Sequence, residues 1–379
     1  MSSAGSRLLV TKGWLRQKLL MLSCACGGLL VSAVALAESQ QPYQLLRGNP
    51  AGYGAVVPGK PIELPADHLP HKDYRIEWWY LTANLQDAQG NDYGVHWTLF
   101  RQSLSAAADP GGWASNQVYM AHGALTTPAG HVYEQRFARG GIGQAGVVLD
   151  EQGHFAAWLD DWQLRGEADG PLPGQLVFTV AGARVVLDLQ ANSPWVLQGQ
   201  NGYSQKSAQG QASYYYSQPH IRISGSLQQH GESLALDGVG WLDREWSSQP
   251  LAPDQPGWDW LALHLDDGNA LMVYRLRQAN GDHWISGSWV DPQGQSTTLA
   301  PADVVFEPLA TTAVTSAAGR VRDLPLSWRV ALPAKGLSWT VSAVAADHWL
   351  DTAFPYWEGP VRVQGSTTGR GYLELTGYE

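Results

Sequence analysis

Short strand-like segments, separated by turns and without a convincing helix, most constrain the fold of this chain. Residues 75–85 and 93–101 are rich in β-branched and aromatic residues and flank a turn that contains Asp and Gly, which predicts a hairpin. Similar segments follow at short, fairly even spacing: 118–124, 131–137, 146–149, 155–159, 162–165, 176–180, 183–189, 213–216, 221–228, 258–265, 270–277, 283–290, 304–309, 326–330, 338–343 and 360–365. This pattern predicts an all-β sandwich or barrel.

The length of the chain and a weak internal sequence repeat indicate two antiparallel β-barrel domains. The chain has 379 residues, more than one small barrel needs. Residues 257–277 repeat the design of residues 75–101, with an aromatic–acid–aromatic strand, an Asp/Gly turn and a return strand that ends in Arg. We place the boundary near residue 248, where a Gln- and Pro-rich linker begins. The predicted domains are 71–248 and 249–379, after an extended segment at 38–70.

The first 37 residues have the pattern of a secretory signal peptide. Basic residues precede an apolar run over residues 19–34, and Ala35-Leu36-Ala37 supplies a small-x-small cleavage site. We therefore expect a protein exported through a cleaved signal peptide, either periplasmic or secreted. The two cysteines, Cys24 and Cys26, both lie in this segment, so the mature chain would have no thiol or disulfide. A lipoprotein with a lipidated Cys24 is the alternative.

The charge of the mature chain argues against nucleic acid as a partner. Without the four cations of residues 1–37, 20 of the 24 basic residues remain against 34 acidic ones, a net charge of −14. Such a chain repels phosphate backbones and anionic membrane surfaces. The 18 Trp and 15 Tyr, against six Phe, favour surfaces that combine an apolar wall with hydrogen-bonding groups.

The stretch Gly240–Ser248 gathers two carboxylates and a guanidinium between two tryptophans. In an extended strand the side chains alternate, so Trp241, Asp243 and Glu245 share one face and Arg244 lies on the other. An acid beside an indole in a partly dry pocket has a raised pKa, which suits a proton donor. The alternative is a structural ion-pair cluster, which is also open for the other acids in aromatic settings, Glu77, Asp259 and Glu358.

His96 and two tyrosines are further candidates. His96 lies on the face of its strand opposite Val95 and Trp97, where it lines a pocket or is a hydrogen-bonded core residue. Tyr214 and Tyr216 share one face of their strand and form either a pocket wall or aromatic core.

The sequence contains no motif that predicts a cofactor or a metal, and its one apparent nucleotide-binding motif lacks the helix that it needs. Residues 141–146 match G-x-G-x-x-G, but a strand rather than a helix follows, so they form a Gly-rich loop. The 11 His show no metal-binding spacing, and no Gly-x-Ser-x-Gly motif occurs. We expect neither a cofactor nor a metal.

Five separated motifs resemble the AttH/CrtC family, which includes secreted lipocalin-like proteins and the carotenoid 1,2-hydratases (hydroxyneurosporene synthases). The motifs are Arg75–Tyr80, Gly240–Ser248, Gly257–Trp260, Tyr356–Gly359 and Gly369–Tyr378, and the resemblance spans residues 71–379. It implies two lipocalin-like (calycin-type) antiparallel β-barrel domains.

The resemblance also implies a catalytic site. In the hydratases an Asp protonates a terminal isoprenoid C=C, and water captures the tertiary cation. Asp243 is most similar to that Asp, and Trp241 lies where the hydratases carry Tyr. Tyr214 and Tyr216 fall near a His-x-Trp pair of the hydratases, so the acid matches while its supporting His is replaced.

Two functions are expected from these observations. The first is an exported AttH-like protein that binds an apolar lipid or isoprenoid-like ligand in a Trp/Tyr-lined pocket, with an ABC transporter permease as a partner. The second is a cofactor-free hydratase (lyase), with Asp243 as general acid and Tyr214, Tyr216 and Trp241 around the cation. Carbohydrate binding or hydrolysis is a third reading. The expected ligand-binding residues are Glu77, Trp79, His96, Trp97, Glu245, Trp246 and Trp258.

Overall fold

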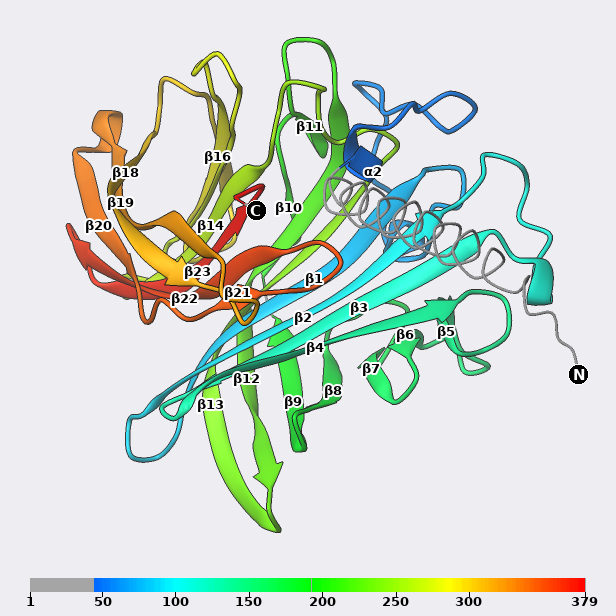
Figure 1. Cartoon of the computed structure of the whole chain (residues 1–379), viewed down its shortest axis with the longest axis horizontal. Helices are drawn as coiled ribbons and strands as arrows, with labels where there is room; N and C mark the ends of the chain where they lie inside the picture. Colours follow the sequence, from blue (N-terminus) through cyan, green and yellow to red (C-terminus); the bar gives the residue numbers. More distant parts are fainter. Residues whose placement is uncertain (1–43, 192, 379) are drawn as a thin grey trace, which may run out of the picture. The chain divides into compact units, whose positions relative to one another are not determined.

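The computed structural model describes residues 44–191 and 193–378, which fold into two antiparallel β-sheets (Figure 1). The all-β prediction is confirmed, since the described residues contain one short α-helix, α2 (Gln44–Arg47), and brief 3-10 turns such as η1 (Ala66–His68). The predicted signal peptide, residues 1–37, lies outside the described residues. No helix in the described ranges is long and apolar enough to cross a membrane.

The first sheet has 13 strands and carries the stretch Gly240–Ser248. Its order is β4-β3-β2-β1-β13-β12-β9-β8-β7-β6-β5, and β10 and β11 pair with β12. The strands are β1 (Ile76–Gln86), β2 (Asp92–Ser103), β3 (Gln117–Thr127), β4 (Gly130–Arg139), β5 (Ala145–Leu149), β6 (Phe155–Leu159), β7 (Trp162–Gly166), β8 (Gly174–Val180), β9 (Ala183–Ala191), β10 (Val196–Leu197), β11 (Tyr203–Gln205), β12 (Ala212–Gln229) and β13 (Glu232–Ser247).

The second sheet has ten strands in the order β17-β16-β15-β14-β23-β22-β20-β19-β18, with β21 paired to β22. The strands are β14 (Trp258–Leu265), β15 (Ala270–Leu276), β16 (Trp284–Val290), β17 (Ser296–Leu299), β18 (Val305–Thr315), β19 (Val321–Leu332), β20 (Leu337–Ala343), β21 (Trp349–Leu350), β22 (Tyr356–Gly365) and β23 (Gly369–Thr376). In both sheets the first strand lies between the second strand and the last one. The two similar sequence segments, 75–101 and 257–277, therefore occupy corresponding places in the two sheets.

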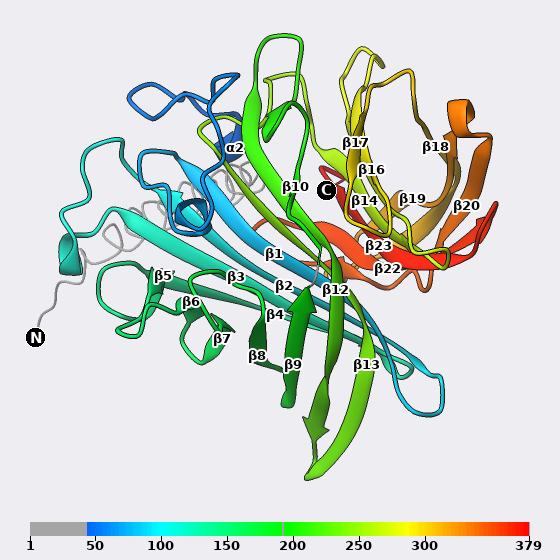
Figure 2. The same ribbon diagram turned by 180° about the vertical axis from the view of Figure 1, so that it is seen from behind.

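Each sheet curls around its own apolar core (Figure 2). Alternate residues of β1, from Trp79 to Leu85, point into the first core, and Leu261 and Leu263 of β14 point into the second. The strand period of two therefore decides which side chains face inward. The predicted division into domains at residue 248 stays a prediction; Leu46–Glu379 is one compact unit that contains both sheets.

The outer face of β1 is buried as well, because it packs against the second sheet. The Tyr80 ring lies 5.3 Å from the ring of Trp260 on β14, edge to face. Tyr80 also donates a hydrogen bond to Glu358 on β22, at 2.5 Å. We call this surface the contact face. It places polar side chains of both sheets in a dry setting.

Candidate functional site

Asp243 lies on β13 and on the contact face of the first sheet. The register places Tyr80 of β1 and Ser217 of β12 directly opposite it. Directly opposite residues of antiparallel strands share a face, with Cβ atoms about 4.5–5.5 Å apart. Tyr215 of β12 lies opposite Glu245 and so faces the same way.

Three donors hold the Asp243 carboxyl group. Tyr215 Oη donates to Oδ2 at 2.6 Å, and Oδ1 accepts from Ser217 Oγ at 2.5 Å and from the Trp241 indole at 2.6 Å. Burial raises the pKa of Asp243 to about 7 against the pull of these hydrogen bonds, and the charge of Glu245 adds to the rise. Asp243 therefore gains and loses its proton near neutral pH.

The negative charge of Glu245 is balanced by the buried ammonium group of Lys206. Lys206 Nζ lies 2.9 Å from Glu245 Oε1, and Ser213 Oγ donates to the same oxygen. The Lys206 ammonium also lies 4.2 Å from the centre of the Tyr274 ring. Glu245 is thus part of an ion pair, while Asp243 receives only neutral donors.

Two further carboxyl groups approach the contact face from the second sheet. Burial raises the pKa of Glu374 on β23 to about 8, against a hydrogen bond from the Trp258 side chain, and the charges of Asp243 and Glu245 add to the rise. Glu358 on β22 is 1% exposed. Burial and the charge of Glu374 raise the pKa of Glu358 well above its usual range. A group of acids with raised pKa values is typical of functional sites.

Histidines from the first sheet extend this polar surface. Tyr356 Oη lies 3.2 Å from His96 Nε2 and 2.8 Å from His122 Nδ1. Burial lowers the pKa of His96 well below its usual range and that of His122 to about 3, so both imidazoles are neutral. His96 Nδ1 lies 3.0 Å from Glu358 Oε2, although the two atoms are not aligned for a hydrogen bond.

Indole rings from both sheets enclose Asp243. The Trp260 indole donates to Tyr215 Oη at 3.2 Å, and its ring centroid lies 6.3 Å from that of Trp241. Trp241 directs its N–H edge at the carboxyl group, and Trp260 directs its N–H edge at the Tyr215 hydroxyl that holds it, so the carboxyl group is buried among the rings. The arrangement suits proton transfer to an uncharged molecule, because burial favours the neutral, protonated form of the acid.

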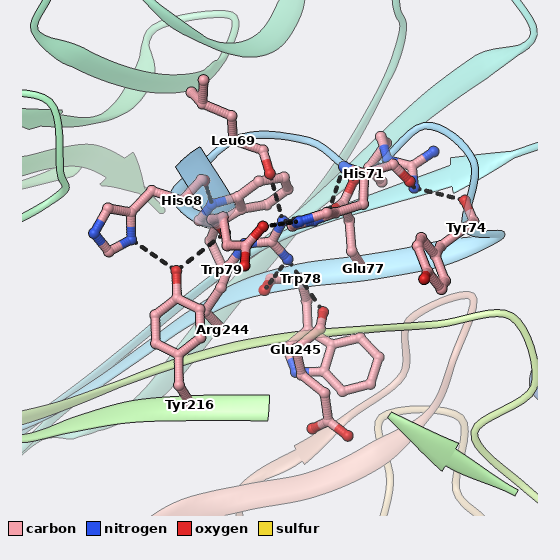
Figure 3. A network of polar contacts seen from close by, with 12 residues as sticks. His68, Leu69, His71, Tyr74, Glu77, Trp78, Trp79, Tyr216, Arg244 and Glu245 are labelled. Carbon is pink, nitrogen blue, oxygen red and sulfur yellow. Dashed lines mark hydrogen bonds and ion pairs between the residues drawn. The ribbon is translucent and has the colours of Figure 1, made fainter. Parts of the chain in front are cut away.

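The opposite face of the same strands carries a different polar cluster, centred on Glu77 (Figure 3). Arg101 and Arg244 both donate to the Glu77 carboxylate. Arg244 Nη2 also lies 2.9 Å from the carbonyl oxygen of Leu69 and 3.0 Å from His71 Nδ1. Burial opposes ionisation of Glu77, but the two arginine charges outweigh it and hold its pKa well below the usual range. Glu77 is therefore an ion-pair residue.

Aromatic rings complete the Glu77 cluster. The His71 ring stacks on Trp246 with centroids 3.9 Å apart, and the Arg244 guanidinium lies 4.0 Å from the centre of the Trp79 ring. The Trp79 indole donates to the carbonyl oxygen of His68 at 3.0 Å. These contacts fasten the segment before β1 to the first sheet. Figure 3 also shows the Glu245 carboxylate on the other side of the strand from Arg244.

The predicted site residues divide between these two faces and do not form one site. The contact face holds Trp241, Asp243, Glu245 and His96. The Trp258 side chain forms a hydrogen bond with Glu374, which approaches this face from the second sheet. The inner face of the first sheet holds the others: Glu77, Trp79, Trp97, Tyr214, Tyr216 and Trp246.

The expected grouping of Tyr214 and Tyr216 with Asp243 is wrong. The register places Tyr214 opposite Trp246 and Tyr216 opposite Arg244, which are inner-face positions. Tyr216 Oη accordingly lies 2.7 Å from His68 Nδ1. Tyr215, between them, is the tyrosine that reaches Asp243.

Sequence reasoning missed several partners of Asp243. Tyr215 and Ser217 have the right spacing to share one face of β12, and this signal was available in the sequence. Trp260 and Glu374 come from the second sheet, and no local pattern places them beside β13. No group of three or more metal-ligating side chains occurs in the described parts of the chain.

Two structures at low identity share this fold. Kievitone hydratase from Nectria haematococca is 17% identical, with a TM-score of 0.61, and the match covers 86% of this chain and 96% of that chain. CghA with Sch210972 is 14% identical, with a TM-score of 0.54, and the match covers 89% and 98%. No curated protein matches the chain.

The family assignment comes from stronger similarities. The AttH structure from Nitrosomonas europaea is 35% identical, with a TM-score of 0.74, and the match covers 86% of this chain and 100% of that chain. The sequence model of the AttH-like family matches residues 55–378. The chain therefore belongs to the AttH-like family, with its lipocalin-like two-sheet fold.

Proposed function

We propose that this chain is a cofactor-free acid catalyst that adds water to a C=C bond of an apolar, isoprenoid-like substrate, with Asp243 as the general acid. One observation carries the proposal: a buried carboxyl group with a pKa of about 7 lies among indole rings and receives only neutral donors. A general acid works best when its pKa lies near the operating pH.

The chemistry balances with water as the second reactant. Asp243 transfers its proton to one alkene carbon, and the π electrons form the new C–H bond. The other carbon becomes a tertiary cation, which the faces of Trp241 and Trp260 stabilise. A water oxygen forms the C–O bond and loses one proton, which restores the Asp243 carboxyl group. The product is a tertiary alcohol.

Turnover of a defined alkene tests this proposal. The protein is incubated with farnesol, and the hydrated diol is measured by gas chromatography with mass spectrometry. Asp243→Asn keeps the shape of the side chain but cannot donate the proton, so we expect a rate at least about 100-fold lower. Asp237→Asn, at an exposed position of the same strand, is the matched control and should keep the wild-type rate. Equal rates for Asp243→Asn and wild type would reject Asp243 as the acid.

Binding without turnover is the second candidate. It is favoured because hydrogen bonds from the protein already occupy both oxygens of the Asp243 carboxyl group. Both carboxyl oxygens accept hydrogen bonds, from Tyr215, Ser217 and Trp241, as in a structural site. Under this proposal the exported protein holds an apolar lipid or isoprenoid and exchanges it with an ABC transporter permease. Native mass spectrometry of protein purified from its own envelope should then reveal a bound lipid. A ligand-free protein that hydrates farnesol would rule this candidate out.

A further inference from the structure

The loop between β2 and β3, residues 104–116, is a compact surface loop whose two ends meet. The backbone N–H of Leu104 donates to the carbonyl oxygen of Asn116 at 2.8 Å. Inside the loop, Asp109 Oδ1 accepts from the backbone of Asn116, and the Asn116 side chain donates to the carbonyl oxygen of Ala107 at 2.8 Å. Compact loops with adjacent ends are frequently functional. Figure 1 shows this loop in cyan, at one end of the first sheet.

The outer surface of this loop is apolar and carries no exposed charge. Trp113, in η2 (Gly112–Ala114), is 79% exposed, and Leu104 is 58% exposed. The other exposed residues of the loop are Ala, Ser, Pro and Gly. Asp109 is its single charged residue, but the Asp109 side chain is only 7% exposed and lies 3.0 Å from Lys72 Nζ. Apolar side chains that are grouped on an exposed surface mark contacts with proteins or membranes.

The size and charge of the loop favour a lipid surface over a protein partner. Stable protein interfaces use about 20–30 residues on each side, more than residues 104–116 offer. Trp is enriched where membranes meet water, because its ring is apolar while its N–H forms a hydrogen bond with a headgroup or water. The acidic chain as a whole repels anionic membranes, so a zwitterionic surface fits an uncharged loop better.

We propose that residues 104–116 form a membrane-docking loop that places Trp113 and Leu104 in the headgroup region of a zwitterionic bilayer. The loop contains none of the residues around Asp243, so this inference does not rest on the proposed function. Two apolar side chains bury a small area, so the binding is reversible. Burial of apolar surface drives it, so added salt does not weaken it.

Flotation with phosphatidylcholine vesicles tests the loop. We expect Trp113→Ala to weaken binding at least about tenfold, because the largest apolar side chain of the loop is lost. Leu104→Ser should weaken binding several-fold. Trp113→Phe keeps an aromatic anchor and should bind within about threefold of wild type. Leu309→Ala is the matched control, because it removes a side chain that is 54% exposed on β18 of the second sheet, and it should bind as wild type does.

Quenching by brominated lipid then locates Trp113 itself. Phosphatidylcholine that is brominated on its acyl chains quenches the fluorescence of tryptophans that enter the bilayer. We expect clear quenching in wild type and its loss in Trp113→Phe, although this variant still binds the vesicles. All variants share the same N-terminus, so the apolar run over residues 19–34 contributes equally to each of them. Because Trp113 is exposed, all variants should unfold at the wild-type temperature.

Three outcomes would overturn the docking loop. Trp113→Ala that binds as tightly as wild type, or quenching that survives in Trp113→Phe, would mean that other residues contact the lipid. A dimer in lipid-free solution that Trp113→Ala converts to a monomer would assign the loop to a second copy of the chain.

Discussion

Two acids of the first sheet, Asp243 and Glu77, are both buried, but the pKa of Asp243 is raised and the pKa of Glu77 is lowered. Glu77 receives two guanidinium groups and stays ionised, whereas Asp243 receives hydroxyl and indole donors and holds its proton near neutral pH. The difference arises from the charge of the partners, since burial alone raises the pKa of both carboxyl groups. A buried ion pair fits a structural role, and a buried carboxyl group with no direct ion-pair partner fits an acid–base role.

Loss of the Glu77 charge is expected to destabilise the fold. Glu77→Gln leaves two buried guanidinium groups without their carboxylate, so we expect a loss of about 3–5 kcal/mol in the free energy of unfolding, measured in urea. Glu134→Gln is the control, because its ion pair with Arg136 spans 3.9 Å at a more exposed position and is worth under about 1 kcal/mol. Similar losses in the two variants would contradict the ion-pair role of Glu77.

At the scale of elements, strand positions were predictable and strand registers were not. Alternation placed Trp241, Asp243 and Glu245 on one face correctly, because a strand has a period of two. The pairing of β12 with β13 depends on contacts between distant residues, so the sequence did not reveal that Ser217 faces Asp243. The resemblance to the hydratases groups Tyr214 and Tyr216 with Asp243, whereas the register places both on the inner face. A one-residue difference in position exchanges inner and outer faces.

Close packing between β2 and the second sheet gives a prediction at this scale. A Cβ atom on Gly94 would lie 2.7 Å from Tyr372 Oη and 3.2 Å from Pro360 Cγ. We expect Gly94→Ala to lower the free energy of unfolding by about 1–3 kcal/mol through overpacking. Tyr372→Phe removes the nearest atom, so a double-mutant cycle should show a favourable coupling above about 0.5 kcal/mol. Additive effects of the two substitutions would mean that the sheets do not touch here.

At the scale of the whole molecule, the candidate site exists because the two sheets share a buried face. The aromatic and acidic motifs predicted the family and the all-β fold, since these motifs are local in sequence. They did not predict that Trp260 and Glu374 would approach Asp243, because packing of one sheet on another leaves no local pattern. The raised pKa of Asp243 is likewise a property of the assembled fold, because burial produces it.

The raised pKa also links Asp243 to stability. Its folded-state pKa of about 7 exceeds the unfolded value of about 3.9, so folding favours the protonated form. This contribution is complete below the unfolded pKa and is lost as the pH rises through about 7. Relative to Asp243→Asn, wild type should therefore lose thermal stability between about pH 4 and pH 7.

The most direct test of the central claim is the titration of Asp243 itself. Aspartate is labelled with ¹³C at the side-chain carboxyl carbon, and the Asp243 resonance is assigned as the one missing from Asp243→Asn. We expect its chemical shift to change with a midpoint near pH 7, well above the values of exposed aspartates. A midpoint close to the ordinary aspartate pKa of about 3.9 would contradict the assignment of Asp243 as a proton donor at neutral pH.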